Sequence, residues 1–288
     1  MEQQDLSSAA LVLLGHGSTL NAESGAPVFQ HAAELRRRRC CAQVREAFWK
    51  QAPQAKDVLA SLEVPRVFVV PLFISEGYFS DVVIPHELGF GGKPGRGECR
   101  LQRRGEQDLV YCRPVGTHSS MTGVLLARAR EVVERFPFPR APACKETTLF
   151  IAGHGTDRNE NSRKAIERQA ELIRAMNLYA AVHVVFMEEE PRITEIHKLA
   201  PTRNVVVVPF FISDGLHVRE DIQVMLGAAE RVVRQRLHEG KPSWRNPSEA
   251  KEKMVWYAPS VGTEPHVADV ILERAKEGAR TCNLKPGN

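Results

Sequence analysis

The sequence lacks the features of membrane-embedded and secreted proteins. No apolar run approaches the roughly 18 residues that a membrane-spanning helix needs. The first residues, MEQQDLSSAALVLLGHGS, contain no basic segment and no cleavage-type sequence, so we expect no signal peptide. Their apolar stretch fits a first β-strand instead. The chain is expected to work without a membrane.

Cysteine is present, but not in patterns that indicate disulfides or metal clusters. The six cysteines form no Cys-x-x-Cys pair. Cys40 and Cys41 are adjacent, which suits neither a simple disulfide nor a metal knuckle. Reduced thiols in a cytoplasmic protein are therefore expected, and an iron–sulfur cluster is not favoured.

A large excess of one charge sign is also missing. The 39 basic and 35 acidic residues leave a formal net charge of +4. This balance is far from the basic footprint of a nucleic-acid-binding protein, and it favours an anionic small molecule only slightly. At 288 residues and 43% apolar composition, the chain is long enough for two domains of ordinary size.

The most informative feature is an internal repeat. Residues 67–77, VFVVPLFISEG, match residues 205–215, VVVVPFFISDG, at 8 of 11 positions. The same shift of 138 residues relates the Gly-His-Gly sequences around His16 and His154. Separate stretches that match at one shift indicate that the chain contains two copies of one unit.

Each copy alternates apolar strands with amphipathic helices, which predicts parallel sheets with right-handed crossovers. The fold class is therefore α/β, with two flavodoxin-like units, each a small parallel sheet flanked by helices. The proline-rich segment FPFPRAPAC, residues 136–144, is the predicted linker, giving domains at 1–140 and 141–288. The helix over 122–135 is expected to close the first unit. Residues 86–108 and 238–253 have no period and are expected to be surface insertions.

Three residues of the second copy follow three predicted strands. His154 follows the first strand, Glu188 the second and His217 the third. The carboxyl ends of parallel strands share one edge of the sheet, where ligands bind in such folds. Imidazole and carboxylate groups suit a divalent first-row metal, and two imidazoles alone would leave coordination positions open for exchange.

Each of these residues, taken separately, also has an interpretation that needs no metal. A single histidine after a strand is commonly a hydrogen-bonding group, and a glutamate within Glu188–Glu190 is commonly a solvated loop residue. The joint occurrence favours a site. The first copy has His16, Lys50 and Phe79 at the corresponding positions, and neither an ammonium nor a phenyl ring ligates a metal at neutral pH. Only the second copy keeps the set.

Together these motifs resemble a known family. GHGT at 153–156, NENSR at 159–163, FMEEEP at 186–191 and VPFFISDGLHVREDI at 208–222 are similar to the sirohydrochlorin chelatases, the CbiX-type class II chelatases, in their two-domain form. The resemblance implies two chelatase-like domains, and Lys50 and Phe79 make the first a degenerate one. It also implies ATP-independent insertion of Co²⁺, or alternatively Fe²⁺ or Ni²⁺, into sirohydrochlorin in cobalamin or siroheme biosynthesis.

The resemblance assigns roles to individual residues. The metal and catalytic histidines of the family correspond to His154 and His217, and the acidic residue corresponds to Glu188. Because the substrate carries many carboxylates, groups near a helix start and in the turn after the third strand are expected to bind it: Arg158, Asn159, Asn161, Arg163, Ser213, Asp214 and Gly215. A solvated loop and helix start is an equally good interpretation of the first four.

Partners and alternatives follow from the same residues. The metal is expected as a substrate, with no tightly bound cofactor, and the partner is a small tetrapyrrole rather than a nucleic acid or membrane. The chain is expected to be a monomer, whose two domains act as an internal dimer, or a weak oligomer. A tetrapyrrole carrier or metallochaperone without turnover remains the alternative. A hydrolase is not favoured, because the chain has no G-x-S-x-G nucleophile elbow.

Overall fold

The computed structural model describes residues 5–18, 22–91, 99–155 and 160–284. Over these residues it contains two compact units, each built on a five-stranded sheet. The strand order is β2-β1-β3-β5-β4 in the first unit and β7-β6-β8-β10-β9 in the second. The identical order confirms the internal repeat and the α/β class.

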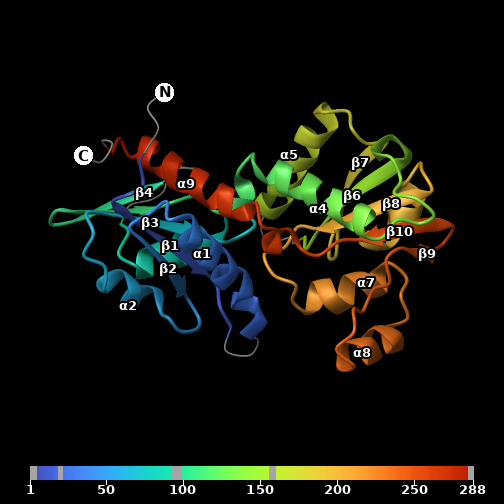
Figure 1. Cartoon of the computed structure of the whole chain (residues 1–288), viewed down its shortest axis with the longest axis horizontal. Helices are drawn as coiled ribbons and strands as arrows, with labels where there is room; N and C mark the ends of the chain where they lie inside the picture. The colour runs from blue at the N-terminus through green and yellow to red at the C-terminus, as the bar shows by residue number, and fades with distance from the viewer. Residues whose placement is uncertain (1–4, 19–21, 92–98, 156–159, 285–288) are drawn as a thin grey trace. The chain divides into compact units, whose positions relative to one another are not determined.

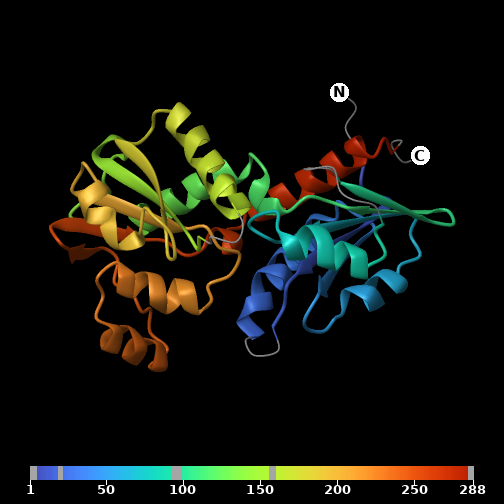
Figure 2. The same cartoon turned by 180° about the vertical axis from the view of Figure 1, so that it is seen from behind.

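The first unit contains β1 (Ala9–Gly15), α1 (Ala26–Arg38), β2 (Gln43–Phe48), α2 (Ala55–Ala60), β3 (Arg66–Pro71), α3 (Ile84–Glu87), β4 (Arg100–Arg104), β5 (Gln107–Tyr111) and α9 (Val267–Thr281). Every residue of β1 and β3 is buried. One sheet face packs on α2 and α3 through an apolar cluster that includes Leu59 and Ile84. Figure 1 shows α9, in red, beside α1, and the reverse view brings the teal segment of α3 to the front (Figure 2).

The second unit contains α4 (Met121–Arg135), β6 (Thr147–Gly153), α5 (Glu160–Ala175), β7 (Ala181–Phe186), α6 (Ile196–Leu199), β8 (Asn204–Pro209), α7 (Ile222–Met225), α8 (Glu230–His238), β9 (Ser248–Ala250) and β10 (Lys253–Tyr257). Its sheet packs on α6 and α7 on one face. The buried stripes of α4 and α5 occupy the other. Sheets covered on both faces explain why the central strands read as continuous apolar runs.

The two segments expected to be irregular insertions are partly ordered strands. Residues 100–104 form β4, which pairs antiparallel with β5, and residues 248–250 form β9, which pairs antiparallel with β10. These strands are short, polar edge strands. A charged edge strand carries little hydrophobic periodicity, because much of its surface faces solvent. The apolar pattern therefore could not reveal them.

The closing helices belong to the opposite copies from those expected. The predicted helix over 122–135 is α4, but α4 contacts β8, β10 and α5 of the second unit. The last helix of the chain, α9, contacts β3, β5 and α1 of the first. The units are therefore residues 1–118 with 265–288, and residues 119–264, rather than halves divided at 140 and 141. An apolar stripe encodes burial but does not specify which of two similar sheets receives it.

A buried arginine holds each of these two helices, α4 and α9, in its unit. Arg274 of α9 is 1% exposed, and its guanidinium donates to Pro114 O at 3.0 Å and to Thr117 Oγ1 at 2.6 Å. Arg128 of α4 donates in the same way to Ser260 O at 3.1 Å and Thr263 Oγ1 at 2.8 Å. Burial lowers the pKa of Arg274, and its ion pair with Glu277 opposes that shift.

The two arginines allow a matched test of which unit each helix, α4 or α9, belongs to. Replacing Arg274 with Met leaves its buried acceptors unpaired and should destabilise the first unit by about 2 kcal/mol. Arg128→Met should do the same to the second unit. Hydrogen exchange followed by mass spectrometry should show faster exchange in residues 5–118 for the first variant and in residues 160–264 for the second. Faster exchange in the other unit would contradict the assignment.

Candidate metal centre

His154 stands immediately after β6 in a tight turn. Gly155 has φ +74°, and a Cβ at this position would lie 2.4 Å from Glu189 Cγ, so only glycine fits. The turn lets the His154 Nδ1 approach the carbonyl oxygen of Gly155 at 2.8 Å. The ring is thereby oriented by its own backbone.

The sheet register brings the other predicted residues to the same edge. β6 lies between β7 and β8 and is parallel to both, with Gly153 opposite Phe186 and Ala152 opposite Pro209. The segments that follow the three strands therefore leave the sheet side by side. Glu188 N donates to His154 O at 3.0 Å, and the rings of His154 and His217 have centroids 5.1 Å apart. The expected convergence of these three residues is confirmed.

His217 begins a short π-helix, His217–Asp221. Its Nδ1 contacts Asp221 Oδ2 at 2.6 Å. The sequence reasoning missed Asp221 because this segment was interpreted only as a turn leading away from the sheet. The His-x-x-x-Asp spacing was the available signal, since residues four apart in a helical segment face each other.

These contacts determine where the imidazole protons lie. A carbonyl oxygen and an ionised carboxylate only accept hydrogen bonds, so Nδ1 is the donor in both rings. The neutral rings therefore carry their lone pairs on Nε2. Such pairing of Nδ1–H with an oxygen is what orients histidines that bind metals through Nε2. With Nδ1 as the donor, it is Nε2 of each ring that would face a metal ion or a proton.

The ring separation fits a shared cation. A first-row metal binds imidazole nitrogen at about 2.1 Å, so two rings on one tetrahedral ion have centroids roughly 5 Å apart. The observed 5.1 Å and the nearly perpendicular rings, at 81°, agree with that arrangement. His154 and His217 are also partly exposed, at 40% and 52% of their side-chain surface. A cation from solution therefore has access to them.

Glu188 lies near Nδ1 of the His154 ring and not near Nε2. Its Oε2 is 3.7 Å from His154 Nδ1, which is an electrostatic contact rather than a hydrogen bond. Within the described ranges, no group of three or more His, Cys, Asp or Glu residues is arranged to hold a metal ion. The geometry is that of two neighbouring imidazoles, each with a carboxylate close to its Nδ1, Glu188 for His154 and Asp221 for His217.

The residues predicted to bind substrate have different surroundings. Arg158 and Asn159 lie outside the described residues, and Asn161 is in the first turn of α5. Arg163 stacks over Phe186 at 4.4 Å and donates to Glu189 Oε2 at 2.6 Å. This ion pair favours a role in holding the loop after β7.

The turn after β8 divides into an anchored part and an open part. Asp214 Oδ1 accepts from Ser260 N at 2.7 Å, so this carboxylate anchors the turn. At Gly215 a Cβ would meet only Ser213 Oγ, at 3.8 Å. The backbone around Ser213 and Gly215 is therefore accessible to a flat ligand.

The first unit keeps the turn but not the ligands. His16 Nδ1 lies 2.8 Å from Gly17 O, which matches the geometry of His154. A π-helix, Phe79–Val83, also follows β3. It presents Phe79 and Val83 where the second unit has His217 and Asp221, while Lys50 Nζ lies 3.6 Å above the Trp49 ring. An aromatic cluster with an ammonium group thus replaces the second imidazole and its carboxylate.

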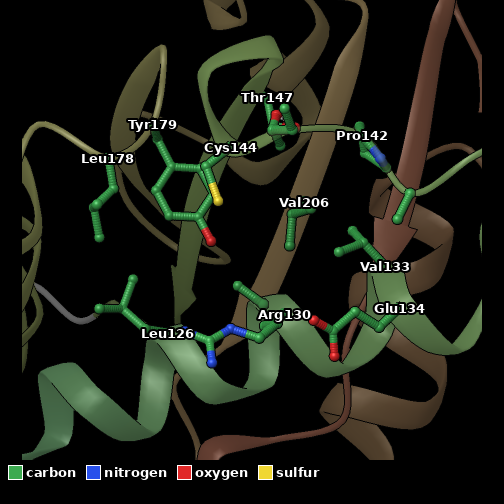
Figure 3. A pocket seen from close by; sticks show the side chains of 13 residues that line it. Leu126, Arg130, Val133, Glu134, Pro142, Cys144, Thr147, Leu178, Tyr179 and Val206 are labelled. Atoms are coloured by element: carbon green, nitrogen blue, oxygen red, sulfur yellow. Dashed lines mark hydrogen bonds between the residues drawn. The ribbon is translucent and has the colours of Figure 1, made fainter.

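A separate cavity of about 240 Å³ lies near the start of β6, at the other end of the strand from His154. Figure 3 shows Cys144, Tyr179, Arg130 and Leu126 around it. Burial, and then the neighbouring Cys144 thiol, raise the pKa of Tyr179. Its lining includes only two residues that commonly ligate metals, Glu134 and Cys144, and no group of three or more such residues in the described part of the chain is placed to hold a metal ion. All six cysteines of the chain have free thiols in the structure.

Comparison with known proteins identifies the family of the chain. The family model named CbiX matches residues 10–132 and 148–278. A protein of Halobacterium salinarum named "Probable sirohydrochlorin cobaltochelatase" is 40% identical over 93% of this chain and 91% of its own length. A "Sirohydrochlorin cobaltochelatase" of Methanopyrus kandleri is 32% identical over 45% of this chain and 94% of its own length.

Solved structures show the same fold. A multi-domain protein of Deinococcus radiodurans, described as structurally similar to chelatases, aligns with a TM-score of 0.74 at 28% identity. The alignment covers 94% of this chain but only 55% of that one. SirB from Bacillus subtilis with Fe³⁺ aligns with a TM-score of 0.65 at 17% identity, over 97% of this chain and 98% of that one. Among the described helices, none is long and apolar enough to cross a membrane.

Asp221 can be tested separately from the imidazoles. Asp221→Asn should weaken Co²⁺ binding by about 10- to 100-fold, because the carboxylate that orients His217 and increases its basicity is lost. Glu220→Gln is the matched control: Glu220 is adjacent but is paired with Arg234, so its loss should change the affinity less than about twofold. Isothermal titration calorimetry measures both. Equal affinities for the two variants would remove Asp221 from the site.

Proposed function

The chain belongs to the CbiX family, and we propose that it inserts a divalent metal ion into sirohydrochlorin without ATP. Co²⁺ is the first choice because the relatives described above are named cobaltochelatases, and Fe²⁺ and Ni²⁺ are the alternatives. The observation that carries the proposal is the His154–His217 pair, with ring centroids 5.1 Å apart and both Nε2 lone pairs available. The activity is that of a lyase.

The first step is capture of the hydrated metal. The two Nε2 atoms replace two of its water ligands, and the remaining positions stay open. Asp221 and Glu188 offset the charge of the ion from behind the two rings. A site with two neutral ligands binds a cation more weakly than one with three or four, which suits an ion that must leave again.

The second step exchanges the metal for two protons. Insertion forms metal–nitrogen bonds in the macrocycle and breaks two of its pyrrole N–H bonds. As the metal leaves, the Nε2 lone pairs of His154 and His217 become free to accept those protons. The imidazolium ions that form are stabilised by Asp221 and Glu188, and they return the protons to water. One pair of nitrogens thus serves first as ligand and then as base.

The macrocycle is held by its rim and one face. Gly215 and Ser213 leave backbone accessible to a flat ring. Arg158, Asn159 and Asn161, which precede or open α5, are proposed to bind its carboxylates. Arg163 is proposed to contribute through Glu189, by positioning the Glu188 loop. The free thiols, including adjacent Cys40 and Cys41, fit a reducing compartment such as the cytoplasm.

Turnover separates this proposal from a carrier function. Sirohydrochlorin is incubated without oxygen with Co²⁺, Fe²⁺ or Ni²⁺ and a small amount of protein, and the absorbance change is followed. A chelatase should convert many equivalents per protein molecule, and His217→Ala should abolish the conversion while circular dichroism stays unchanged. Product that stops at one equivalent would identify a tetrapyrrole or metal carrier instead.

The two copies make unequal contributions in this mechanism. His154→Ala should lower kcat/KM by about 100-fold or more, because a ligand and a base are lost together. His16→Ala should cause a loss of less than about tenfold, since His16 faces Trp49 and Phe79 and has no second imidazole. Both variants occupy the same turn, so each controls for the other. An inactive His16→Ala with an active His154→Ala would place the working site in the first unit.

A further inference from the structure

Two cysteines stand at the adjoining ends of β4 and β5 in the first unit. Cys99 directly precedes β4, and Cys112 directly follows β5. Cys112 is 1% exposed, whereas Cys99 is partly exposed. The proposed metal ligands, His154 and His217, lie in the second unit. Metal insertion therefore does not account for this pair of thiols.

The sheet register places Cys99 and Cys112 opposite each other. β4 and β5 pair antiparallel with Arg100 opposite Tyr111, so one further step of the same register brings Cys99 opposite Cys112. The Cα atoms of directly opposed antiparallel residues are about 4.5 or 5.5 Å apart. A disulfide needs Cα atoms that are about 4.4 to 6.8 Å apart. The backbone spacing that the register predicts therefore suits a disulfide between these two residues.

Both sulfur atoms lie against α9 at Gly278, which is buried. A Cβ at this position would be 2.9 Å from Cys112 Sγ and 3.7 Å from Cys99 Sγ. The two sulfurs are thus within 4 Å of one point, on the sheet face that α9 covers. Only a residue without a side chain leaves the space that the Cys112 thiol occupies, so the helix accommodates the pair.

The second unit has neither the buried thiol nor the glycine. YCRPVGT in the first unit aligns with YAPSVGT in the second at a shift of 146 residues, and α4 and α9 begin at the same shift. Ala258 therefore stands at the position of Cys112, and Val132 of α4 stands at the position of Gly278. The fold is compatible with a smaller strand residue and a larger helix residue here, so the thiol pair is particular to the first unit.

The two thiols differ in acidity and in access to solvent. Hydrogen bonds from the Cys112 thiol and from the backbone N–H of Arg113 lower the pKa of Cys99. Burial, and then its hydrogen bond to Cys99, raise the pKa of Cys112. Because Cys99 is the more exposed of the two, an oxidant in solution reaches it first. Oxidation-sensitive cysteines are commonly accessible, of low pKa and next to a second thiol.

We propose that Cys99 and Cys112 form a peroxide-sensitive dithiol. The Cys99 thiolate attacks one oxygen of hydrogen peroxide, which breaks the O–O bond, gives a sulfenic acid on Cys99 and releases hydroxide. The Cys112 sulfur then attacks Cys99 Sγ, so that the S–S bond forms and the S–O bond breaks. The leaving hydroxyl takes the Cys112 proton and departs as water. Two thiols are oxidised to one disulfide, and one peroxide is reduced to two water molecules.

Mass spectrometry of the full-length protein tests the proposal. The reduced protein is treated with a small excess of hydrogen peroxide in the presence of a chelator, its free thiols are blocked with N-ethylmaleimide, and it is digested without reduction. The first disulfide should join Cys99 to Cys112, and dithiothreitol should reverse it. A first disulfide between Cys99 and Cys282, which ends α9, would overturn the proposal, as would the absence of any disulfide.

Adjacent Cys40 and Cys41 provide an internal control. Their sulfurs are 4.0 Å apart, but burial raises the pKa of Cys41 to about 12. This pair should oxidise about tenfold more slowly than Cys99 and Cys112, or more slowly still, because the thiolate is the form that reacts. Faster oxidation of Cys40 and Cys41 would contradict the assignment.

Serine variants separate the two roles. With Cys112 and Cys282 both replaced by Ser, the sulfenic acid on Cys99 has no neighbouring thiol, so dimedone should label Cys99. Cys99→Ser should give neither a label nor a disulfide at Cys112, which is buried. Cys282→Ser is the matched control and should form the disulfide between Cys99 and Cys112 within about twofold of the wild-type rate. Loss of that disulfide in Cys282→Ser would overturn the proposal, and the wild-type product decides even if a variant fails to fold.

Discussion

The convergence of His154, Glu188 and His217 depends on one constraint, the parallel register of β6 between β7 and β8. Because all three strands end at the same edge, the segments that follow them are forced together although His154 and His217 are more than 60 residues apart in the chain. Sheet hydrogen bonds, not the histidines, fix this geometry. The side chains then need only local contacts to reach their final orientation: Gly155 O for His154 and Asp221 for His217.

This constraint explains why much of the fold and site was predictable. The apolar runs of β6 and β8 identify buried parallel strands. The residue that follows such a strand lies at the carboxyl edge of the sheet. His154, Glu188 and His217 could therefore be grouped from the sequence alone. The repeat at 138 residues predicted that both units would share one topology, and their sheets do have the same strand order.

What could not be predicted depends on information that an apolar pattern does not contain. The partner of an amphipathic helix is one example: the buried stripes of α4 and α9 predict that each helix packs on a sheet but do not specify which one. Hydrogen bonds from Arg128 and Arg274 hold the two helices to turns that are distant in the sequence. The edge strands are another, since β4 and β9 are polar. Asp221 was not predicted, because a short polar segment after a strand is compatible with either a turn or a π-helix, and only the π-helix brings Asp221 to His217.

The first unit separates the requirements of the fold from those of the site. Its π-helix, Phe79–Val83, persists with Phe79 and Val83 in place of His217 and Asp221, so that histidine and that aspartate do not impose the helical geometry. The strand end and the buried residues around Ser80 suffice, with the Tyr111 hydroxyl bonded to Ser80 O. Phe79 and Val83 occupy positions i and i+4 of this π-helix, as His217 and Asp221 do in the π-helix of the second unit. The two units therefore differ at both positions: Phe79 stands in place of His217, and Val83 stands in place of Asp221. The fold tolerates both, because these side chains lie at the exposed strand edge and not in the core that holds the sheet together.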